Sequence, residues 1–315
     1  MILTWMLYSM VLAVVLGVAA LLVDGALRDA GRSTRWIWLA TTVATATVSF
    51  VALFVPIGFV YHLMPGPQSA PWLMRPATTY VRTYDTLTAL DGYLSVALWC
   101  VSVIVGGIFA LSIARLVARR RRWLPSVVDG APVLVSDTDG PAVVGFLSGT
   151  IVLPRWVVNE SERLRRLIVM HEVEHLQAGD ARLIVVAAAF VIAQPWNPFA
   201  WWLARRLRLA IEIDCDARVL RRGPDVHTYG MLLLEVGTRA PFGGVAAAFS
   251  TRPTSSLEER LRIMTSRTRK ARLAVGRIVA AIGIIAATAA FLPEPSGLHC
   301  RLEDLGFTRA VGHSH

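Results

Sequence analysis

Four long apolar stretches dominate the 315-residue sequence and restrict what the chain can fold into. They cover about residues 1–23, 36–61, 93–117 and 273–292. A helix that crosses a bilayer needs about 20 consecutive apolar residues, and each stretch reaches that length. No basic segment precedes the first stretch, so we interpret it as a retained helix rather than a cleaved signal peptide. The sequence therefore predicts a mostly α-helical membrane protein with four transmembrane helices.

Basic residues flank the four stretches unevenly, and this asymmetry predicts their orientation. The chain has 32 Lys and Arg against 22 Asp and Glu, a net charge of +10. Arginines gather in the first loop, after the third stretch and before the fourth, whereas loop 62–92 has two arginines balanced by two aspartates. The positive-inside rule then places residues 118–272 in the cytoplasm, and the N-terminus and tail 293–315 outside the plasma (inner) membrane. Because the charge marks topology, we expect no direct nucleic-acid binding.

Segment 118–272 has the length of an ordinary domain. Short β-like runs at its start predict a small antiparallel sheet: Pro132–Val135, Ala142–Phe146 and Thr150–Leu153. Asn159 and Glu162 have the spacing of a capping box, which opens a helix that ends at Gly179. Helical patterns follow to residue 272, so the segment is expected to be an α+β domain.

The helix that ends at Gly179 carries an HExxH motif, His171 to His175. Residues four apart share one face of a helix, so both imidazoles can bind one metal ion. Two histidines suit zinc, and Glu172 is placed to take a proton from a water molecule that the metal activates. The motif predicts a single zinc ion and the hydrolysis of peptide bonds. Glu174, the other acidic residue within the motif, is interpreted as a solvent-facing charge.

A second helix supplies the remaining groups of the predicted site. Asn197 and Pro198 are typical of an N-cap and a first helical position, and the helix is expected to run to Arg222. On its face lie Glu212 and Asp216, four residues apart. We predict Glu212 as the third zinc ligand and Asp216 as the acceptor for the second N–H of a ligating histidine. Cys215 lies nearby but competes poorly as a ligand, and Asp214 is ambiguous.

The apolar stretch Leu183–Ala193 lies between the two motifs and tests the topology. It is too short to cross a bilayer comfortably. If it did cross, Glu212 would emerge on the side opposite His171 and His175. We therefore expect the stretch to be buried in the domain or to lie along the bilayer surface.

Several segments together resemble the BlaR/MecR family of integral-membrane zinc metallopeptidases. They are VVGFLSGTIVLP, HEVEHLQAGD, WNPFAWWLARRLRLAIEIDCDARVL, TYGMLLLEV and LEERLRIM. The resemblance implies a zincin-like (gluzincin) catalytic domain between the third and fourth helices. It also implies His171, His175 and Glu212 as zinc ligands, Glu172 as the catalytic carboxylate and Asp216 as the outer partner. Asp180 also matches a residue that is favoured at this position in the family. The sequence alone does not indicate its role.

The best-known members of that family carry a penicillin-binding sensor after the fourth helix. Only 23 residues follow Leu292, and the sole lysine, Lys270, has Arg267 where an SxxK motif needs serine. We therefore expect no such sensor domain in this chain. The resemblance implies a protein substrate, and by analogy a cytoplasmic transcriptional repressor whose cleavage would be antirepressor signalling. The oligomeric state stays open, a homo-oligomer included.

Two other functions remain open at this point. One is an HtpX-like membrane metallopeptidase of protein quality control, which also combines HExxH with a later ExxxD. The other is a non-catalytic membrane receptor or scaffold in which the metal only holds the fold. A site with three protein ligands leaves one open position, which favours an enzyme over a scaffold.

Overall fold

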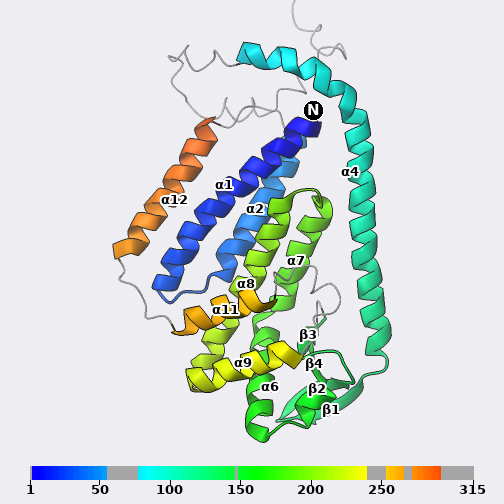
Figure 1. Cartoon of the computed structure of the whole chain (residues 1–315), viewed down its shortest axis with the longest axis vertical. Coiled ribbons are helices and arrows are strands. Elements are labelled where there is room, and N and C mark those ends of the chain that lie inside the picture. The colour runs from blue at the N-terminus through cyan, green and yellow to red at the C-terminus, as the bar shows by residue number, and fades with distance from the viewer. Residues whose placement is uncertain (1, 55–76, 146–147, 240–252, 266–271, 292–315) are drawn as a thin grey trace, which may run out of the picture.

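The computed structural model describes residues 2–54, 77–145, 148–239, 253–265 and 272–291, which are mostly helical (Figure 1). In chain order the helices are α1 (Ile2–Asp29), α2 (Arg35–Phe54), α4 (Ala77–Arg120), α5 (Arg155–Val158), α6 (Glu162–Ala178), α7 (Asp180–Ala193), α8 (Pro198–Leu220), α9 (Val226–Arg239), α11 (Pro253–Thr265) and α12 (Arg272–Phe291). The predicted tail 293–315, the first half of loop 62–92 and the end of the second apolar stretch lie outside the described residues.

Helices α1, α2, α4 and α12 contain most of the four predicted apolar stretches, but α4 begins at Ala77, so the described half of the predicted loop 62–92 is helical. Two of them contain segments long and apolar enough to cross a membrane: Trp5–Asp29, with a mean hydropathy of 2.6, and Asp91–Arg120, with 2.4. The chain thus has two membrane-capable helices among the described residues, and the count of four spans stays a prediction.

Helices α7 and α8 form a hairpin that lies alongside α1 and α2 (Figure 1). Apolar side chains from α1, α2, α4, α7 and α8 share one buried core, which includes Ala13, Trp38, Phe109, Phe190 and Leu203. The stretch Leu183–Ala193 was expected inside the domain or along the bilayer surface, whereas it packs in this bundle with one face buried and with Val185 and Val186 exposed. Its partners, however, are helices of the N-terminal 120 residues as well as α8, so it does not belong to the core of segment 118–272 alone.

The hairpin extends along nearly the whole of α1. At its tip, the ring of Trp196 packs edge-on against Trp5 near the start of α1, with centroids 5.3 Å apart. At its base, Asp214 accepts a hydrogen bond from the backbone N–H of Thr34, in the connection that follows α1, at 3.1 Å. The chain thus enters the helical bundle in α7 and returns in α8, so Glu212 stays beside the HExxH helix.

The turn of the hairpin explains why α8 begins where the sequence predicts. Asn197 Oδ1 accepts a hydrogen bond from the backbone N–H of Phe199 at 3.0 Å, and Pro198 occupies the first helical position. Asn197 Nδ2 also donates to Gln194 Oε1 at 3.1 Å. Both amide side chains are fully buried, and this contact gives Asn197 Nδ2 and Gln194 Oε1 a partner that apolar side chains could not supply. The predicted N-cap is confirmed.

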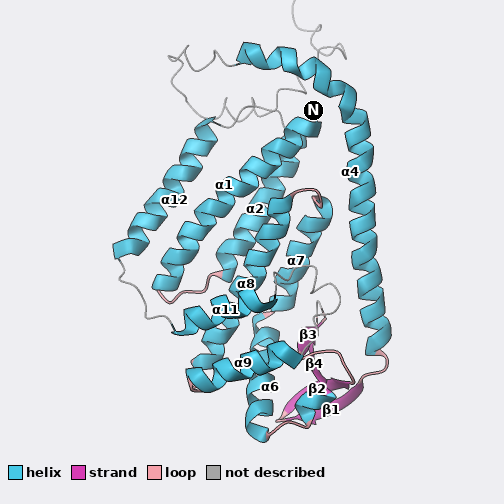
Figure 2. Ribbon diagram, in the orientation of Figure 1, coloured by secondary structure: helices cyan, strands magenta, loops and turns pink. Residues whose placement is uncertain are grey.

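A four-stranded sheet lies beside α6 at the lower end of the molecule, away from this turn (Figure 2). Its strands are β1 (Leu124–Val128), β2 (Ala131–Ser136), β3 (Ala142–Val144) and β4 (Thr150–Pro154), in the order β1-β2-β4-β3. The prediction of an antiparallel sheet was wrong in one pairing, because β2 and β4 are parallel, with Val133 opposite Ile151. The β3 strand lies at the edge of the sheet and pairs antiparallel with β4. The chain therefore reverses direction between β2 and β3 and again between β3 and β4, so that β4 runs in the same direction as β2.

The start of α6 also differs from the prediction. The residue at its N-cap is Ser161, whereas Asn159 ends the preceding short helix α5 and donates its backbone N–H to the Arg155 carbonyl at 3.1 Å. Asn159 has the αR conformation of that helix end and therefore cannot cap α6. The other end is as predicted, because Gly179 adopts the left-handed conformation at φ 66° and stops α6.

Candidate metal centre

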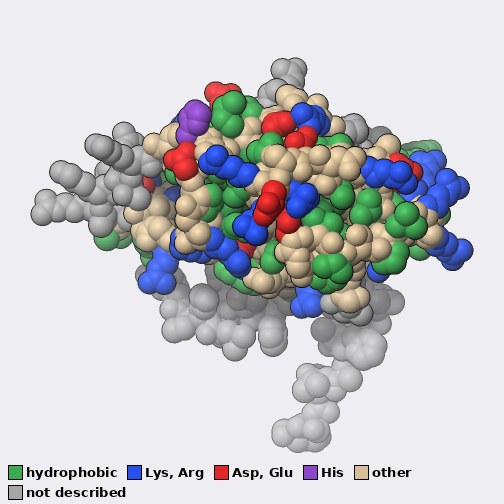
Figure 3. Space-filling model, turned by 90° about the horizontal axis from the view of Figure 1, so that it is seen from below, with side chains coloured by type: hydrophobic (Ala, Val, Ile, Leu, Met, Phe, Trp, Pro, Cys, Tyr) green, Lys and Arg blue, Asp and Glu red, His purple; other side chains and the backbone are tan. Residues whose placement is uncertain are grey.

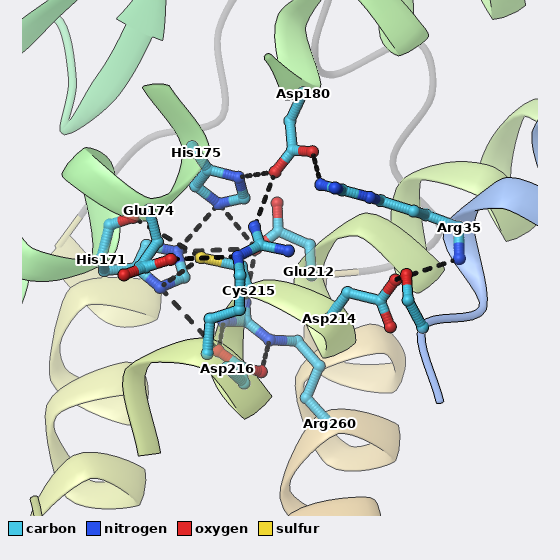
Figure 4. A network of polar contacts seen from close by, with 12 residues as sticks. Arg35, His171, Glu174, His175, Asp180, Glu212, Asp214, Cys215, Asp216 and Arg260 are labelled. Atoms are coloured by element: carbon cyan, nitrogen blue, oxygen red, sulfur yellow. Dashed lines mark hydrogen bonds and ion pairs between the residues drawn. The ribbon is translucent and has the colours of Figure 1, made fainter. Parts of the chain in front are cut away.

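Three donor atoms from α6 and α8 meet at one point (Figure 4). The Nε2 atoms of His171 and His175, four residues apart on α6, lie 3.2 Å from each other. Oε2 of Glu212, from α8, lies 3.8 Å from each of them. These are the three residues that the sequence predicts as metal ligands, and the fold brings all three together.

The spacing of these atoms suits a zinc ion. A point equidistant from all three lies about 2.1 Å from each, which is the usual length of zinc–nitrogen and zinc–oxygen bonds. Two imidazoles and a carboxylate are also a donor set that zinc accepts at catalytic sites. The residues present therefore fit the metal.

Cys215 offers a second combination of donors, because it can share a metal with His171 and His175. Its sulfur, however, lies 3.4 Å from Nδ1 of His171, the nitrogen that faces away from the Nε2 pair. Burial raises the pKa of the Cys215 thiol to about 11, so the thiol stays protonated near neutral pH. A thiolate is the form that binds metal, and the Glu212 carboxylate is therefore the better third donor.

A sharp bend in the chain orients His175. Helices α6 and α7 meet at Gly179 with an angle of 65° between them. Residues five apart on one straight helix would point in different directions, but the bend turns Asp180 back towards α6. Asp180 Oδ2 lies 2.8 Å from Nδ1 of His175, which leaves Nε2 free for a metal. The structure thus explains a position for which sequence reasoning had no role.

Asp180 is almost completely buried and is held by two arginines. Nη1 of Arg35, the first residue of α2, lies 2.5 Å from Asp180 Oδ1, and Nη2 of Arg218 donates to Oδ2 at 3.1 Å. The hydrogen bond to Asp180 raises the pKa of His175 well above its usual value, although burial opposes this. Without a metal, His175 is therefore protonated near neutral pH.

His171 is oriented through a longer chain of contacts. Its Nδ1 lies 2.8 Å from the hydroxyl of Tyr229, which donates in turn to Asp216 Oδ1 at 2.8 Å. Asp216 was predicted to accept directly from a histidine, but its Oδ1 is 3.9 Å from Nδ1 of His171 and reaches it through the Tyr229 hydroxyl. Burial and the neighbouring His175 hold the pKa of His171 well below its usual value, so this imidazole is neutral.

Arg260 of α11 closes the site on the side of α8. Its guanidinium donates to both oxygens of Asp216, at 2.8 and 2.7 Å, and Nη1 lies 3.1 Å from Glu212 Oε2. Burial acts to raise the pKa of Glu212, but Arg260 and the two imidazoles outweigh it and lower that pKa to about 2. Glu212 is therefore ionised, as a metal ligand must be.

Glu172 is the carboxylate next to His171 on α6, and its side chain is buried. Burial raises its pKa to about 7, which is the range in which a carboxylate can both accept and return a proton near neutral pH. The predicted catalytic residue thus has the protonation behaviour that general acid–base chemistry needs.

The structure corrects the expected position of one acidic residue near the site and decides the position of another, which the sequence left open. Glu174, expected to face solvent, is buried and forms ion pairs with Arg218, at 3.1 Å, and Arg222. Its helix face is covered by α8, which the α-helical pattern of α6 alone could not reveal. Asp214 is also buried, and it points away from Glu212 and Asp216 on α8. Its carboxylate accepts the backbone N–H of Thr34, just before α2 begins.

Sequence reasoning assigned no role in the site to Arg35, Tyr229 or Arg260, which are distant in sequence from His171: Arg35 precedes it by 136 residues, and Tyr229 and Arg260 follow it by 58 and 89. Tyr229 and Arg260 fall in segments that resemble the family, TYGMLLLEV and LEERLRIM, which was the available signal for them. Arg35 looked like one of several basic residues beside an apolar stretch.

Comparison with known proteins agrees with this geometry. A stretch of 81 residues is 26% identical to the regulatory protein BlaR1 of Bacillus licheniformis; it makes up 26% of this chain but only 14% of that protein. The model of the family described as BlaR1 peptidase M56 matches residues 4–264, which is most of the chain. This match includes α1, α2 and α4 as well as the metal centre and α11. The chain therefore belongs to the BlaR1 peptidase M56 family.

Proposed function

We propose that the protein is a zinc endopeptidase with His171, His175 and Glu212 as zinc ligands and Glu172 as the catalytic carboxylate. The observation that carries this proposal is the convergence of the three donor atoms on one point, beside a buried carboxylate whose pKa is about 7. When bound, zinc polarises the scissile carbonyl and activates a water molecule for attack.

The residues of the chain perform the proton transfers. Glu172 takes a proton from the attacking water and returns it to the departing amine, which its pKa near neutrality permits. Tyr229 and Asp180 hold the two imidazoles with Nε2 towards the metal. Arg260 keeps Glu212 ionised and in place.

The site is proposed to act at the cytoplasmic face of the membrane. The C-terminal ends of α1 and α4 point towards the end of the molecule that holds the sheet and α6 (Figure 1). Their last turns contain Arg28 and Arg119, as the positive-inside rule requires of a cytoplasmic end. That end of the molecule also carries basic and acidic side chains, interspersed with apolar ones (Figure 3). Segment 118–272 then forms the catalytic domain, except that its α7–α8 hairpin enters the helical bundle beside α1 and α2, and segment 273–292 forms a further span.

The substrate is proposed to be a regulatory protein, a transcriptional repressor being the candidate that the family resemblance favours. The name of the Bacillus licheniformis relative, a regulatory protein, supports this choice. An HtpX-like quality-control enzyme would instead cleave many damaged membrane proteins.

The proposal is tested with Glu172→Gln in the full chain, reconstituted with zinc. We expect the variant to keep one zinc ion per chain and to lose cleavage, so that it retains its substrate in membranes for identification by mass spectrometry. Glu162→Gln is the matched control, because Glu162 lies exposed on the same helix. Full activity of Glu172→Gln would refute the mechanism, and retention of many unrelated proteins would favour quality control. Zinc binding without any cleavage by the native chain would favour the scaffold.

A further inference from the structure

Arg35, the first residue of α2, contacts acidic residues from two different helices of the metal centre (Figure 4). Its guanidinium pairs with Asp180 of α7, and its backbone N–H donates to Oδ2 of Asp214, of α8, at 3.1 Å. Asp180 holds His175, and Asp214 is two residues from Glu212. The start of α2 is therefore linked to two of the three donor residues: to His175 through Asp180, and to the helix of Glu212 through Asp214.

Asp214 fixes the backbone of residues 33–35 at the start of α2 through hydrogen bonds. Besides the N–H of Arg35, it accepts the N–H of Thr34 at 3.1 Å and the hydroxyl of Ser33. A carboxylate at a helix N-terminus satisfies backbone N–H groups that have no partner within the helix. The position of the Arg35 backbone is thus determined by α8, the helix that also carries Glu212.

The guanidinium of Arg35 then determines how the Asp180 carboxylate lies. It binds Oδ1, while Oδ2 is left for His175 and Arg218. With both oxygens occupied, the carboxylate cannot rotate away from the imidazole. Only 12% of the Arg35 side chain and 2% of the Asp180 side chain are exposed, so solvent screens this pair little.

We propose that Arg35 is a positioning residue of the metal centre. Acting through Asp180, it orients the His175 imidazole, and the connection between α1 and α2 is therefore part of the site. This inference rests on the proposed function, in which His175 binds the metal. It assigns a role in the centre to a residue that otherwise looks like one of the arginines that mark topology.

The test measures metal binding by the full-length protein in nanodiscs. Co²⁺ serves as a spectroscopic probe, since its d–d absorption bands report the geometry of the ligands, and Zn²⁺ affinity is measured by competition with a chelator. The variants are Arg35→Gln and Arg35→Lys. Arg32→Gln is the matched control, because Arg32 is exposed in the same connection.

We expect Arg35→Gln to weaken Zn²⁺ binding about tenfold and to change the Co²⁺ bands, as loss of support behind a ligand does. Arg35→Lys restores part of the affinity, because it keeps the charge but not the fork of the guanidinium. Arg32→Gln binds both metals like the native chain.

Native affinity and native Co²⁺ bands in Arg35→Gln would overturn the inference. If Arg35→Gln fails to fold, native metal binding by Arg35→Lys together with an unchanged Co²⁺ spectrum overturns it instead. Failure of the proposed function gives a different result, in which the native chain binds neither ion or His175→Ala binds both as tightly as the native chain does.

Discussion

Nη1 of Arg260 lies 3.1 Å from Oε2 of Glu212, the same oxygen that faces both histidines of the metal centre. A helix close to the C-terminal apolar stretch thereby contributes a cation to a carboxylate that is expected to bind a divalent metal. The positive charge of the guanidinium lies beside the position expected for the metal. It neutralises part of the negative charge of Glu212 and Asp216.

Replacing Arg260 by Gln should therefore destabilise the metal-free protein more than the zinc-bound protein. Loss of one partner leaves the buried Asp216 without its cation, which costs about 3–5 kcal/mol in comparable buried pairs. Bound zinc neutralises Glu212 and recovers part of this loss. We expect a larger zinc-induced rise of the unfolding midpoint in Arg260→Gln than in the native chain, measured by thermal unfolding with and without zinc.

Arg262→Gln provides the comparison, because Arg262 is exposed on the same helix. It should leave both midpoints unchanged. An equal loss of stability with and without zinc in Arg260→Gln would contradict the assignment of Arg260 to the neutralisation of the metal centre.

Tyr229→Phe should weaken zinc binding about tenfold, because the hydroxyl that joins His171 to Asp216 is lost. The Nδ1 group of His171 is then buried without its partner, and the imidazole is free to turn. Isothermal titration with zinc checks the prediction, and Tyr93→Phe, at a hydroxyl-bearing residue that is 80% exposed on α4, is the control. Unchanged affinity in Tyr229→Phe would show that packing alone orients His171.

Zinc affinity should rise with pH near neutrality. The pKa of His175 is raised well above its usual value by Asp180, so zinc must displace a proton at any pH below that raised pKa. Asp180→Asn removes the largest of the contributions that raise this pKa. We expect this variant to bind zinc more weakly at high pH but with a smaller dependence on pH, in chelator competition between about pH 6 and 8. The same slope in both proteins would mean that another group releases the proton.

Gly17→Ala should disturb the docking of the α7–α8 hairpin on α1. A Cβ atom at Gly17 would lie 2.3 Å from Cζ3 of Trp202, whose ring is itself packed edge-on against Trp38. Overpacking of this kind costs about 1–3 kcal/mol, and we expect a lower unfolding midpoint in nanodiscs.

The double variant Gly17→Ala/Trp202→Phe should recover part of that stability, because the smaller ring leaves room for the methyl group. Gly107→Ala on α4 is the matched control, since a Cβ there meets nothing within 4 Å. If Gly17→Ala is as stable as Gly107→Ala, the hairpin does not pack on α1 as closely as described.

Local patterns predicted the parts of the structure that depend on local geometry. The i,i+4 spacing placed His171 and His175 on one face, and the same spacing placed Glu212 and Asp216 on another, because a helix repeats every 3.6 residues. The stop at Gly179 and the start at Asn197 also followed from backbone and capping chemistry. The capping-box prediction at Asn159 was wrong, because this residue ends the short helix α5 and Ser161 lies at the N-cap of α6.

The sequence by itself determined that the chain is a membrane protein carrying an HExxH metal motif with a later acidic ligand, because apolar length and helical spacing are written in consecutive residues. Only the tertiary structure decided that α7 and α8 turn back within the bundle, that β2 pairs parallel with β4, and that Arg35, Tyr229 and Arg260 support the donors. Those arrangements depend on which distant segments pack together, and packing partners leave no fixed spacing in a single sequence.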